Sequence, residues 1–207
     1  PGRPRYWPVG VPPSGPVENL RFRLGNRLLG HAENAAGLEF TLNGPTLKFN
    51  QVTRIALTGA DMQGTLDGQP VASYCVIAIQ PGQILKLGKV SGEGARAYLA
   101  VAGGLQCTPY LGSRSTFTLG QFGGHGGRAL RTGDVLHFQE AAPTPPSATV
   151  PDSLKPALGN HWTLRVIYGP HGAPDFFTDD DMAMFFSTDW QVHYNSSRCP
   201  LHTTPRP

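Results

Sequence analysis

The side chains best suited to chemistry in this sequence lie in glycine-rich stretches, and the first of these is residues 112–116. With the sequence GSRST, this stretch places the permanent cation of Arg114 between the hydroxyls of Ser113 and Ser115. A guanidinium beside hydroxyl groups is suited to hold a carboxylate or a developing oxyanion. The alternative is a polar turn with an arginine on the surface.

Residues 123–128, with the sequence GGHGGR, form the second stretch. The glycines around His125 let the backbone come very close to a ligand or to another strand. The stretch is not a phosphate-binding loop, because it lacks the Lys-Ser/Thr ending and a strand that leads directly into a helix. An imidazole titrates near neutral pH, so His125 is a candidate acid or base, with a solvated loop histidine as the alternative.

Two further positions join polar groups to backbone turns. In residues 12–16, PPSGP, prolines stiffen the chain and Gly15 permits a positive φ, so Ser14 and nearby amides are presented at the start of a helix. An anion or a polarised oxygen can bind there, although the same pattern serves as a structural cap. Asp61 follows Gly59 and Ala60, where it can accept N–H groups of a substrate or close a turn through its own backbone.

The sequence predicts no metal site and no assignable Ser-His-Asp triad. Asp179, Asp180 and Asp181 are consecutive, and consecutive side chains on a helix point in different directions, so they cannot share one ion well. Thr178 before them is a suitable N-cap, which favours the start of a helix. The seven histidines show no metal-ligand spacing with each other or with the cysteines.

The elements that must position these groups are mainly short strands. With 26 Gly and 20 Pro, turn signals recur about every 8–12 residues, which indicates a β-barrel or sandwich instead of alternating βα units. A helix is predicted over residues 17–29, where leucines recur at four-residue spacing. Strands or hairpins are predicted at 38–42, 46–49, 55–57, 65–70, 74–79, 84–87, 95–102, 135–138, 162–168 and 190–194.

Composition divides the chain into four parts. Residues 1–140 form the first domain, and residues 141–159, beginning AAPTPPSATVP, predict a stiff, extended, proline-rich linker. Residues 160–198 begin a second subdomain. Residues 199–207 have neither a hydrophobic period nor a core, which predicts a disordered tail.

Charge and cysteine content exclude several classes of protein. The formal net charge is +3, and the Lys and Arg residues are scattered, without the basic stripe of a nucleic-acid binder. No apolar run approaches the ~18 residues that a membrane span needs, and no signal peptide is visible. Cys75, Cys107 and Cys199 fit neither a disulfide framework nor a zinc site, which predicts a reducing, cytoplasmic location.

Six motifs, in order along the chain, resemble those of the allophanate-hydrolase-subunit-2-type domain. That family occurs in the carboxyltransferase of biotin-dependent urea carboxylase and in 5-oxoprolinase subunits. The motifs are GVPPSGP, LEFTLNGPTLKF, ALTGADMQGTLDGQPV, RAYLAVAGGL, LGSRSTFTLGQFGG and GRALRTGDVL. The later run YGPHGAPDFFTDDDMAMFFSTDWQVHYNSSR is more similar to urea carboxylase and urea amidolyase, since the 5-oxoprolinase branch usually has glutamine where this chain has His171.

The resemblance implies a cyclophilin-like β-barrel with a few short helices, followed by an incomplete second half-domain. It implies transfer of a carboxyl group from carboxybiotin to urea, giving allophanate. Biotin would be carried on a separate carrier domain, and ATP would be used by a separate biotin carboxylase domain. These two domains and a subunit-1-like half of the carboxyltransferase are the implied partners. The alternatives are a 5-oxoprolinase subunit and a non-catalytic binding or regulatory module.

A site for this reaction must orient urea, exclude water and stabilise negative charge. Candidate residues are chosen by chemical type within the matched motifs. The candidate catalytic residues are Ser14, Asp61, Arg114 and His125. The candidate substrate-binding residues are Gly15, Ser113, Ser115 and Gly124.

The end of the chain departs from the family pattern. After Arg198 the family continues into a Gly-x-Arg-Leu-x-Gly-Pro strand, where this chain has CPLHTTPRP. We expect a truncation here, and the first residue, Pro1, also suggests a piece of a longer protein. An incomplete half-domain leaves strand edges and apolar faces uncovered, Trp190 and Tyr194 among them, which favours the non-catalytic module for the isolated chain.

Overall fold

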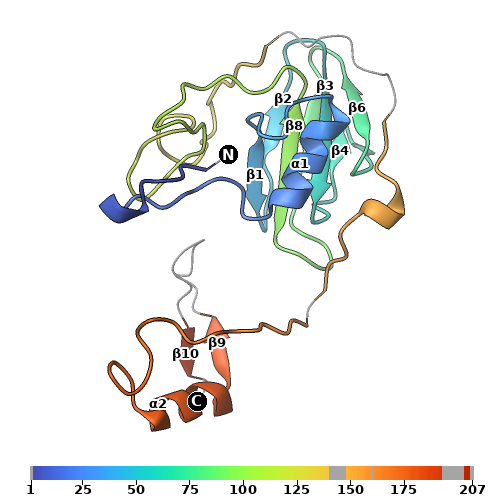
Figure 1. Ribbon diagram of the computed structural model, residues 1–207. Helices are drawn as coiled ribbons and strands as arrows, with labels where there is room; N and C mark the ends of the chain where they lie inside the picture. The colour runs from blue at the N-terminus through green and yellow to red at the C-terminus, as the bar shows by residue number, and fades with distance from the viewer. Residues whose placement is uncertain (1, 140–147, 160, 193–202, 206–207) are drawn as a thin grey trace. The chain divides into compact units, whose positions relative to one another are not determined.

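The computed structural model describes residues 2–139, 148–159, 161–192 and 203–205 (Figure 1). Its contacts divide the chain into two compact units, Pro1–Asn160 and His161–Pro207. The helices and strands, in chain order, are η1 (Trp7–Val9), α1 (Asn19–Leu28), β1 (Leu38–Thr41), β2 (Thr46–Lys48), β3 (Thr53–Gly59), β4 (Thr65–Leu66), β5 (Gln69–Pro70), β6 (Val76–Ile79), β7 (Ile84–Lys86), β8 (Arg96–Val101), η2 (Asp152–Leu154), α2 (Asp179–Ser187), β9 (Trp190–Val192) and β10 (Thr203–Pro205).

The first unit is built on two four-stranded antiparallel sheets. One sheet has the strand order β1-β8-β3-β6, and the other has the order β2-β7-β4-β5. In the centre of the first sheet, β3 pairs with β8 so that Ile55 lies opposite Val101 and Leu57 opposite Leu99. The predicted mainly β fold with a few short helices is confirmed.

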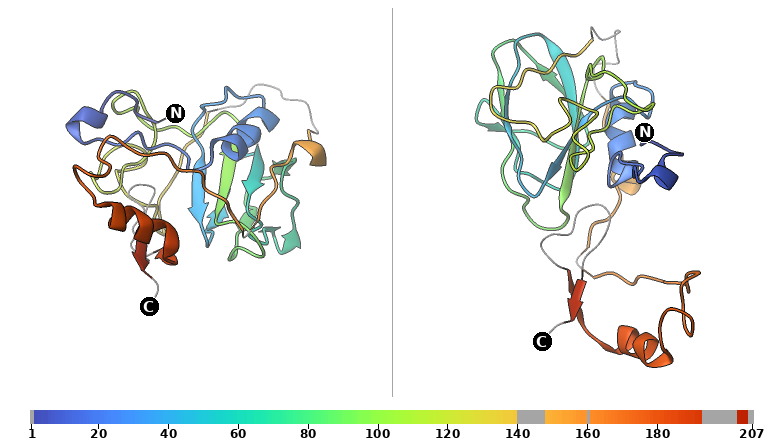
Figure 2. Two further views of the ribbon diagram at one scale, coloured as in Figure 1. Left: turned by 60° about the horizontal axis from the view of Figure 1, so that its bottom comes forward. Right: turned by 90° about the vertical axis from the view of Figure 1, so that its left-hand side faces the viewer.

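Alternation along the strands decides which side chains enter the core between the two sheets. Ile55 and Leu57 from β3 meet Leu85 from β7 there, because successive strand residues point to opposite faces. Ala56 and Ala100 point the other way and belong to a second apolar cluster beneath α1. Their small side chains leave room for α1 to pack on β3 and β8. Figures 1 and 2 show α1 lying along the outer face of the first sheet.

The helix predicted over residues 17–29 is observed as α1, and its start is fixed by Glu18. The Glu18 carboxylate accepts the backbone N–H of Leu20 at 3.0 Å and that of Arg21 at 3.1 Å. These bonds satisfy amides that have no partner within the helix. The helix therefore begins at Asn19, with Val17 and the N-cap Glu18 between it and the stiff PPSGP turn.

Two predicted strands do not form. Residues 135–138 make one isolated bridge, between Leu105 and Phe138, and no named strand. Residues 162–168 have apolar side chains at every second position but no described strand partner, and Leu164 on that face is 80% exposed. A strand forms only when a neighbouring strand supplies its backbone hydrogen bonds, so the apolar pattern alone did not predict these two segments correctly.

The second half of the predicted linker packs against the first unit, whereas residues 141–147 lie outside the described residues. Val150 is buried beneath α1, and its N–H donates to the Tyr74 carbonyl oxygen at 2.9 Å. Arg21 donates to the carbonyl oxygens of Pro156 and Ala157 at 3.0 and 3.1 Å. Backbone N–H and carbonyl groups of an extended segment need hydrogen-bond partners from elsewhere in the chain. Here Tyr74, just before β6, and Arg21 of α1 supply them, so this half of the linker is not a free spacer.

The second unit contains α2 and a two-stranded antiparallel ladder of β9 and β10. Thr178 and Asp181 form the capping box of α2, which confirms the predicted helix start. Most of the predicted tail lies outside the described residues, but Thr203–Pro205 within it forms β10, because β9 supplies a partner strand. In the described part of the chain, no helix reaches the length and apolarity needed to cross a lipid bilayer.

Candidate functional site

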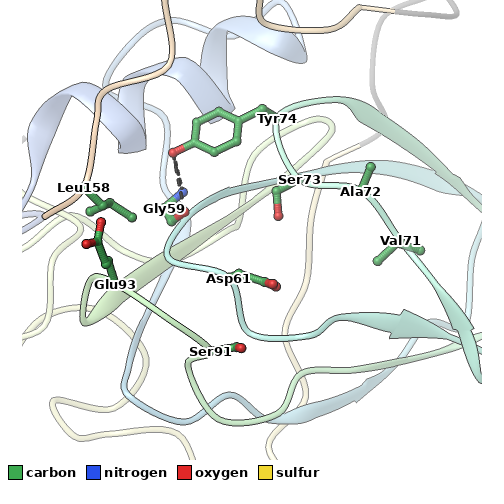
Figure 3. Close-up of a pocket in the computed structure, with 9 residues that line it drawn as sticks. All are labelled: Gly59, Asp61, Val71, Ala72, Ser73, Tyr74, Ser91, Glu93 and Leu158. Carbon is green, nitrogen blue, oxygen red and sulfur yellow. Dashed lines mark hydrogen bonds between the residues drawn. The ribbon is translucent and has the colours of Figure 1, made fainter. Parts of the chain in front are cut away.

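Asp61, two residues after the end of β3, lines a cavity of about 500 Å³ on the first unit (Figure 3). The chain reverses at Gly59, whose φ of +102° and contact with the β8 backbone leave no room for a side chain. We call the residues around this cavity the Asp61 pocket. They are Gly59, Asp61, Val71, Ala72, Ser73, Tyr74, Ser91, Glu93 and Leu158.

The polar groups of the Asp61 pocket are mainly hydrogen-bond acceptors. Asp61 and Glu93 are exposed carboxylates, and Ser73 and Ser91 add hydroxyls. One carboxylate oxygen of Asp61 accepts the backbone N–H of Gln63 at 2.7 Å, which fixes the side chain in its turn. An exposed carboxylate has further lone pairs for N–H groups of a ligand. The pocket is therefore suited to a small molecule rich in N–H donors.

Two of the other candidate residues, Ser113 and Ser115, gather around a buried arginine, Arg3, which has no exposed surface. Its Nε donates to the Tyr110 carbonyl oxygen at 3.2 Å, and its terminal nitrogens donate to the hydroxyl (3.4 Å) and the carbonyl oxygen of Ser115. Its guanidinium lies 5.0 Å from the centre of the Phe122 ring. Burial lowers the pKa of Arg3, but the guanidinium stays charged. We call Arg3, Tyr110, Ser113, Ser115 and Phe122 the Arg3 cluster.

The hydroxyls of Ser113 and Ser115 form a pair within the Arg3 cluster. Their Oγ atoms lie 2.7 Å apart, and the Ser113 Oγ also accepts the Ser115 N–H at 3.1 Å. Two backbone hydrogen bonds between Tyr110 and Ser113 close the loop beneath them. Hydroxyls linked in a chain to a buried cation are polarised. Ser113 is buried and Ser115 is half-buried, so Ser115 is the member of the pair that can contact a ligand.

The PPSGP turn is joined to the same cluster through the main chain of residues 2–3. The Arg3 N–H donates to the Pro13 carbonyl oxygen, and a Cβ on Gly2 would collide with that same oxygen. Ser14 and Gly15 have φ values of +57° and +90°, as the stiff turn requires. The structure therefore links the PPSGP turn to the main chain of Arg3 at Pro13, while the Ser14 hydroxyl donates to the Pro12 carbonyl oxygen at 3.5 Å.

The other side of the PPSGP turn is fixed to the first sheet. The Val17 N–H donates to the Glu39 carboxylate at 2.8 Å, and the Glu18 N–H donates to the Tyr98 hydroxyl at 2.9 Å. Tyr98 is buried, and this burial raises the pKa of Tyr98, so its phenol stays neutral. The turn is thus held at both ends by bonds to buried or half-buried groups.

Close packing within the chain explains two glycines of the stretch 123–128. A Cβ on Gly123 would overlap the Arg3 guanidinium and the Ser115 carbonyl oxygen, and a Cβ on Gly124 would overlap the Thr116 hydroxyl. Both residues also have positive φ values, +73° and +55°. The sequence allowed a close approach to a ligand or to another strand. At Gly123 and Gly124 the close approach is to other parts of the chain itself.

His125 lies in the same loop beside Asp134. Its Nε2 is 3.8 Å from the nearer Asp134 oxygen. Asp134 forms a bidentate pair with Arg128 at 2.7 and 2.8 Å, and accepts the Arg131 N–H at 2.8 Å. The bond from Arg128, with that from Arg131, holds the pKa of Asp134 well below its usual range. His125 therefore sits beside a carboxylate that stays ionised.

The remaining candidates do not join the Arg3 cluster through their side chains. Arg114 is exposed, and its Nε donates to the Cys107 carbonyl oxygen at 3.3 Å. Asp61 lines a pocket whose other lining residues include none of the predicted site residues. Within the described ranges, no three His, Cys, Asp or Glu side chains lie close enough to hold a metal ion.

Sequence reasoning missed Arg3, Glu93 and Asp134. Arg3 lies in an extended Pro- and Gly-rich segment without periodicity, so nothing local showed its burial. Glu93 reaches the Asp61 pocket through the turn between β7 and β8. Asp134 gave a usable signal, because it follows Arg128 by six residues in a turn that can bring the two charges together.

Comparison with known proteins identifies the family. Residues 9–203 match the family model described as carboxyltransferase domain, subdomain A and B. The chain is 43% identical over 208 residues to urea amidolyase of Saccharomyces cerevisiae, covering 96% of this chain and 11% of the yeast protein. It is 33% identical over 198 residues to a 5-oxoprolinase subunit of Escherichia coli, covering 95% of this chain and 61% of the bacterial protein.

The crystal structure of Kluyveromyces lactis urea carboxylase has the same fold, with a TM-score of 0.87 and 41% identity. That match covers 100% of this chain and 19% of the K. lactis chain. The chain spans about a tenth of the length of the S. cerevisiae urea amidolyase. The family resemblance drawn from the motifs is confirmed, and the chain belongs to the carboxyltransferase domain family.

Proposed function

We propose that this chain is part of the carboxyltransferase of a urea carboxylase, which transfers a carboxyl group from carboxybiotin to urea to form allophanate. The observation that carries the proposal is 43% identity to a urea amidolyase over 96% of the chain, against 33% to a 5-oxoprolinase subunit over 95%. His171 supports the same choice, because it stands where the resemblance places glutamine in the 5-oxoprolinase branch.

The Asp61 pocket supports urea as the substrate through its acceptors. Urea presents N–H donors on both nitrogens and one carbonyl oxygen. In this proposal Asp61 and Glu93 accept the N–H groups and orient the attacking nitrogen, while Ser73 and Ser91 bind the carbonyl oxygen. The cavity of about 500 Å³ falls within the range of small-molecule sites, about 300–1,000 Å³.

The Arg3 cluster supports the second requirement of the reaction, the stabilisation of negative charge. Donors that are fixed before the reaction stabilise developing charge without reorganising. We assign the transferred carboxylate to the Ser115 hydroxyl and the backbone of Gly124, which are only half-buried; Ser113 and Gly15 are buried and act by holding these neighbouring groups in place.

Three further residues take roles in the same proposal. The Ser14 hydroxyl and the Arg114 guanidinium stabilise the charge that develops during transfer. We assign His125 to the same side of the reaction, as a donor to the developing charge, because it lies beside the ionised Asp134 and is not among the residues of the Asp61 pocket.

Biotin has a ureido group with one N–H on each nitrogen and one carbonyl oxygen, so the carboxylates and hydroxyls of the Asp61 pocket fit it too. When bound, biotin supplies the carboxyl group. In the proposal it arrives on a separate carrier domain, a separate biotin carboxylase domain uses ATP, and a subunit-1-like half completes the carboxyltransferase. The small share of the yeast relative that the chain spans is consistent with partners elsewhere. The proposed location is the cytoplasm.

A replacement experiment tests this function. The matching segment of K. lactis urea carboxylase is exchanged for this chain, and ATP cleavage by the chimera is measured with urea or with 5-oxoproline. A second chimera carrying the matching segment of the E. coli 5-oxoprolinase subunit is the control.

Cleavage that depends on urea in the first chimera, but not in the control, supports the proposal. Dependence on 5-oxoproline would instead assign the chain to the 5-oxoprolinase branch. A folded chimera that responds to neither compound would favour the non-catalytic module.

A further inference from the structure

We infer that Arg3 is a positioning residue of the carboxyltransferase: it fixes the PPSGP turn and the GSRST loop to each other, so that their hydroxyls and amides keep one geometry. The inference rests on the proposed function for its effect on the reaction. The fixing itself rests only on contacts in the first unit. Arg3 lies outside residues 9–203, which match the family model.

The side chain of Arg3 holds the GSRST loop through the fork shape of its guanidinium. Nε and both terminal nitrogens donate to three oxygens, one on Tyr110 and two on Ser115. Ser115 is 112 positions away in sequence. Lysine has one nitrogen on a flexible stem and cannot reproduce a planar fork with three fixed directions.

The charge of Arg3 has no compensating carboxylate in the described part of the chain. Its partners are two carbonyl oxygens, a hydroxyl and the face of Phe122. Burying a cation is costly unless its hydrogen bonds are satisfied, so the surrounding oxygens must stay in place. This requirement makes the loop rigid around Arg3.

The main chain beside Arg3 holds the PPSGP turn. The Arg3 N–H donates to Pro13, while Gly2 packs so tightly on Pro13 and Ser14 that no side chain fits. One residue therefore binds the turn with its backbone and the loop with its side chain. Figures 1 and 2 show the N-terminal segment lying beside the segment that follows β8.

Gly123 completes the arrangement, because it leaves the space that the guanidinium occupies. The contacts around Arg3 thus come from three separate parts of the chain. None of the Asp61 pocket residues is among them. A change at Arg3 should therefore affect the transfer step and leave the binding of urea unchanged.

The test uses the variant Arg3→Lys and the matched control Arg5→Lys, since Arg5 is exposed and lies two residues away. Hydrogen exchange is measured on the full chain, at the amides of Ser115 and Phe117 in the loop and of Ile55 and Leu57 in β3. Steady-state kinetics with urea are measured on the K. lactis chimera carrying each variant.

We expect Arg3→Lys to speed loop exchange by about tenfold while β3 exchange is unchanged, because a local unit opens independently of the core. We expect kcat to fall by about tenfold to a hundredfold with the KM for urea unchanged, as a misplaced group predicts. Arg5→Lys should match the wild type in both measurements.

Unchanged loop exchange, or an unchanged kcat in an active chimera, overturns the inference. An inactive wild-type chimera defeats the proposed function alone, and hydrogen exchange then still decides whether Arg3 fixes the loop. If Arg3→Lys speeds exchange in β3 as well, Arg3→Met replaces it, because methionine fills much of the same space without burying a charge. Normal loop exchange in a folded Arg3→Met chain, which lacks all three donors, would also overturn the inference.

Discussion

The Asp61 pocket and the Arg3 cluster are two polar regions of the first unit with opposite charge and opposite exposure. The pocket presents the carboxylates of Asp61 and Glu93 to solvent around a cavity. The cluster surrounds a fully buried guanidinium with hydroxyl and carbonyl oxygens. Exposed groups can exchange water for a ligand, whereas buried groups that are hydrogen-bonded to separate parts of the chain hold the chain in place. The difference separates recognition, which we propose for the Asp61 pocket, from positioning, which we propose for the Arg3 cluster.

The largest effect is expected from Gly123→Ala, which inserts a methyl group into the Arg3 cluster. The new Cβ would overlap the Arg3 guanidinium at a positive φ, so the free energy of unfolding should fall by about 2–4 kcal/mol. Guanidinium chloride denaturation measures this change. The matched control is Gly126→Ala, which has a similar φ but open space, and should cost about 1–2 kcal/mol. Equal losses would mean that packing on Arg3 is unimportant.

The pocket is tested next by Asp61→Asn in the K. lactis chimera. Asparagine keeps an oxygen for the Gln63 N–H, so the turn survives, but the charge that accepts N–H groups of urea is lost. The KM for urea should rise by about tenfold, in keeping with one hydrogen bond to a charged group. Asp67→Asn is the control, because Asp67 also accepts a backbone N–H (from Ile84, 2.9 Å) but lies outside the pocket. An unchanged KM would remove Asp61 from the urea site.

The ion pair of Asp134 with Arg128, at the end of the glycine-rich stretch 123–128, is tested by the pH dependence of stability in Asp134→Asn. Because Arg128 lowers the pKa of folded Asp134, the carboxylate stabilises the fold fully above its unfolded pKa of about 3.9 and loses this contribution as pH falls below it. The melting temperature of the wild type should therefore exceed that of Asp134→Asn by a constant amount above about pH 5 and converge with it in stronger acid. A difference that does not depend on pH would show that the ion pair is not its source.

The smallest effect on stability is expected from Arg114→Ala, the exposed counterpart of Arg3. Its guanidinium donates to the Cys107 carbonyl oxygen at the protein surface, so the free energy of unfolding should change by less than about 0.5 kcal/mol. If Arg114 stabilises charge in the reaction, kcat in the chimera falls although the fold is intact. A destabilisation as large as that of Gly123→Ala would place Arg114 in the structural part of the site instead.

Two similar sequence patterns show why the fold was only partly predictable. Residues 38–42 and residues 162–168 both have apolar side chains at every second position, yet β1 forms in the first and no strand in the second. β1 pairs with β8 and its Phe40 is buried, whereas Trp162 is 71% exposed. Helix caps are local signals, so α1 and α2 were both predictable; strands depend on partners elsewhere in the chain.

The candidate site was predictable where chemistry is local and not where it depends on folding. The motif PPSGP and the hydroxyls of Ser113 and Ser115 were visible in sequence, and the structure places them together. Their connection through Arg3 spans more than a hundred positions, which no spacing rule can detect. The role of Gly123 was equally hidden, because the group that needs its space is Arg3.

The measurement that tests the proposed function most directly is the transfer of labelled carboxyl groups. The K. lactis chimera is supplied with labelled hydrogencarbonate, ATP and either urea or no acceptor, and the label in allophanate is counted. The proposal predicts label in allophanate only when urea is present, and less of it with Arg3→Lys than with Arg5→Lys. Label that reaches the biotin carrier but never urea, in a chimera whose unmodified parent is active, would contradict it.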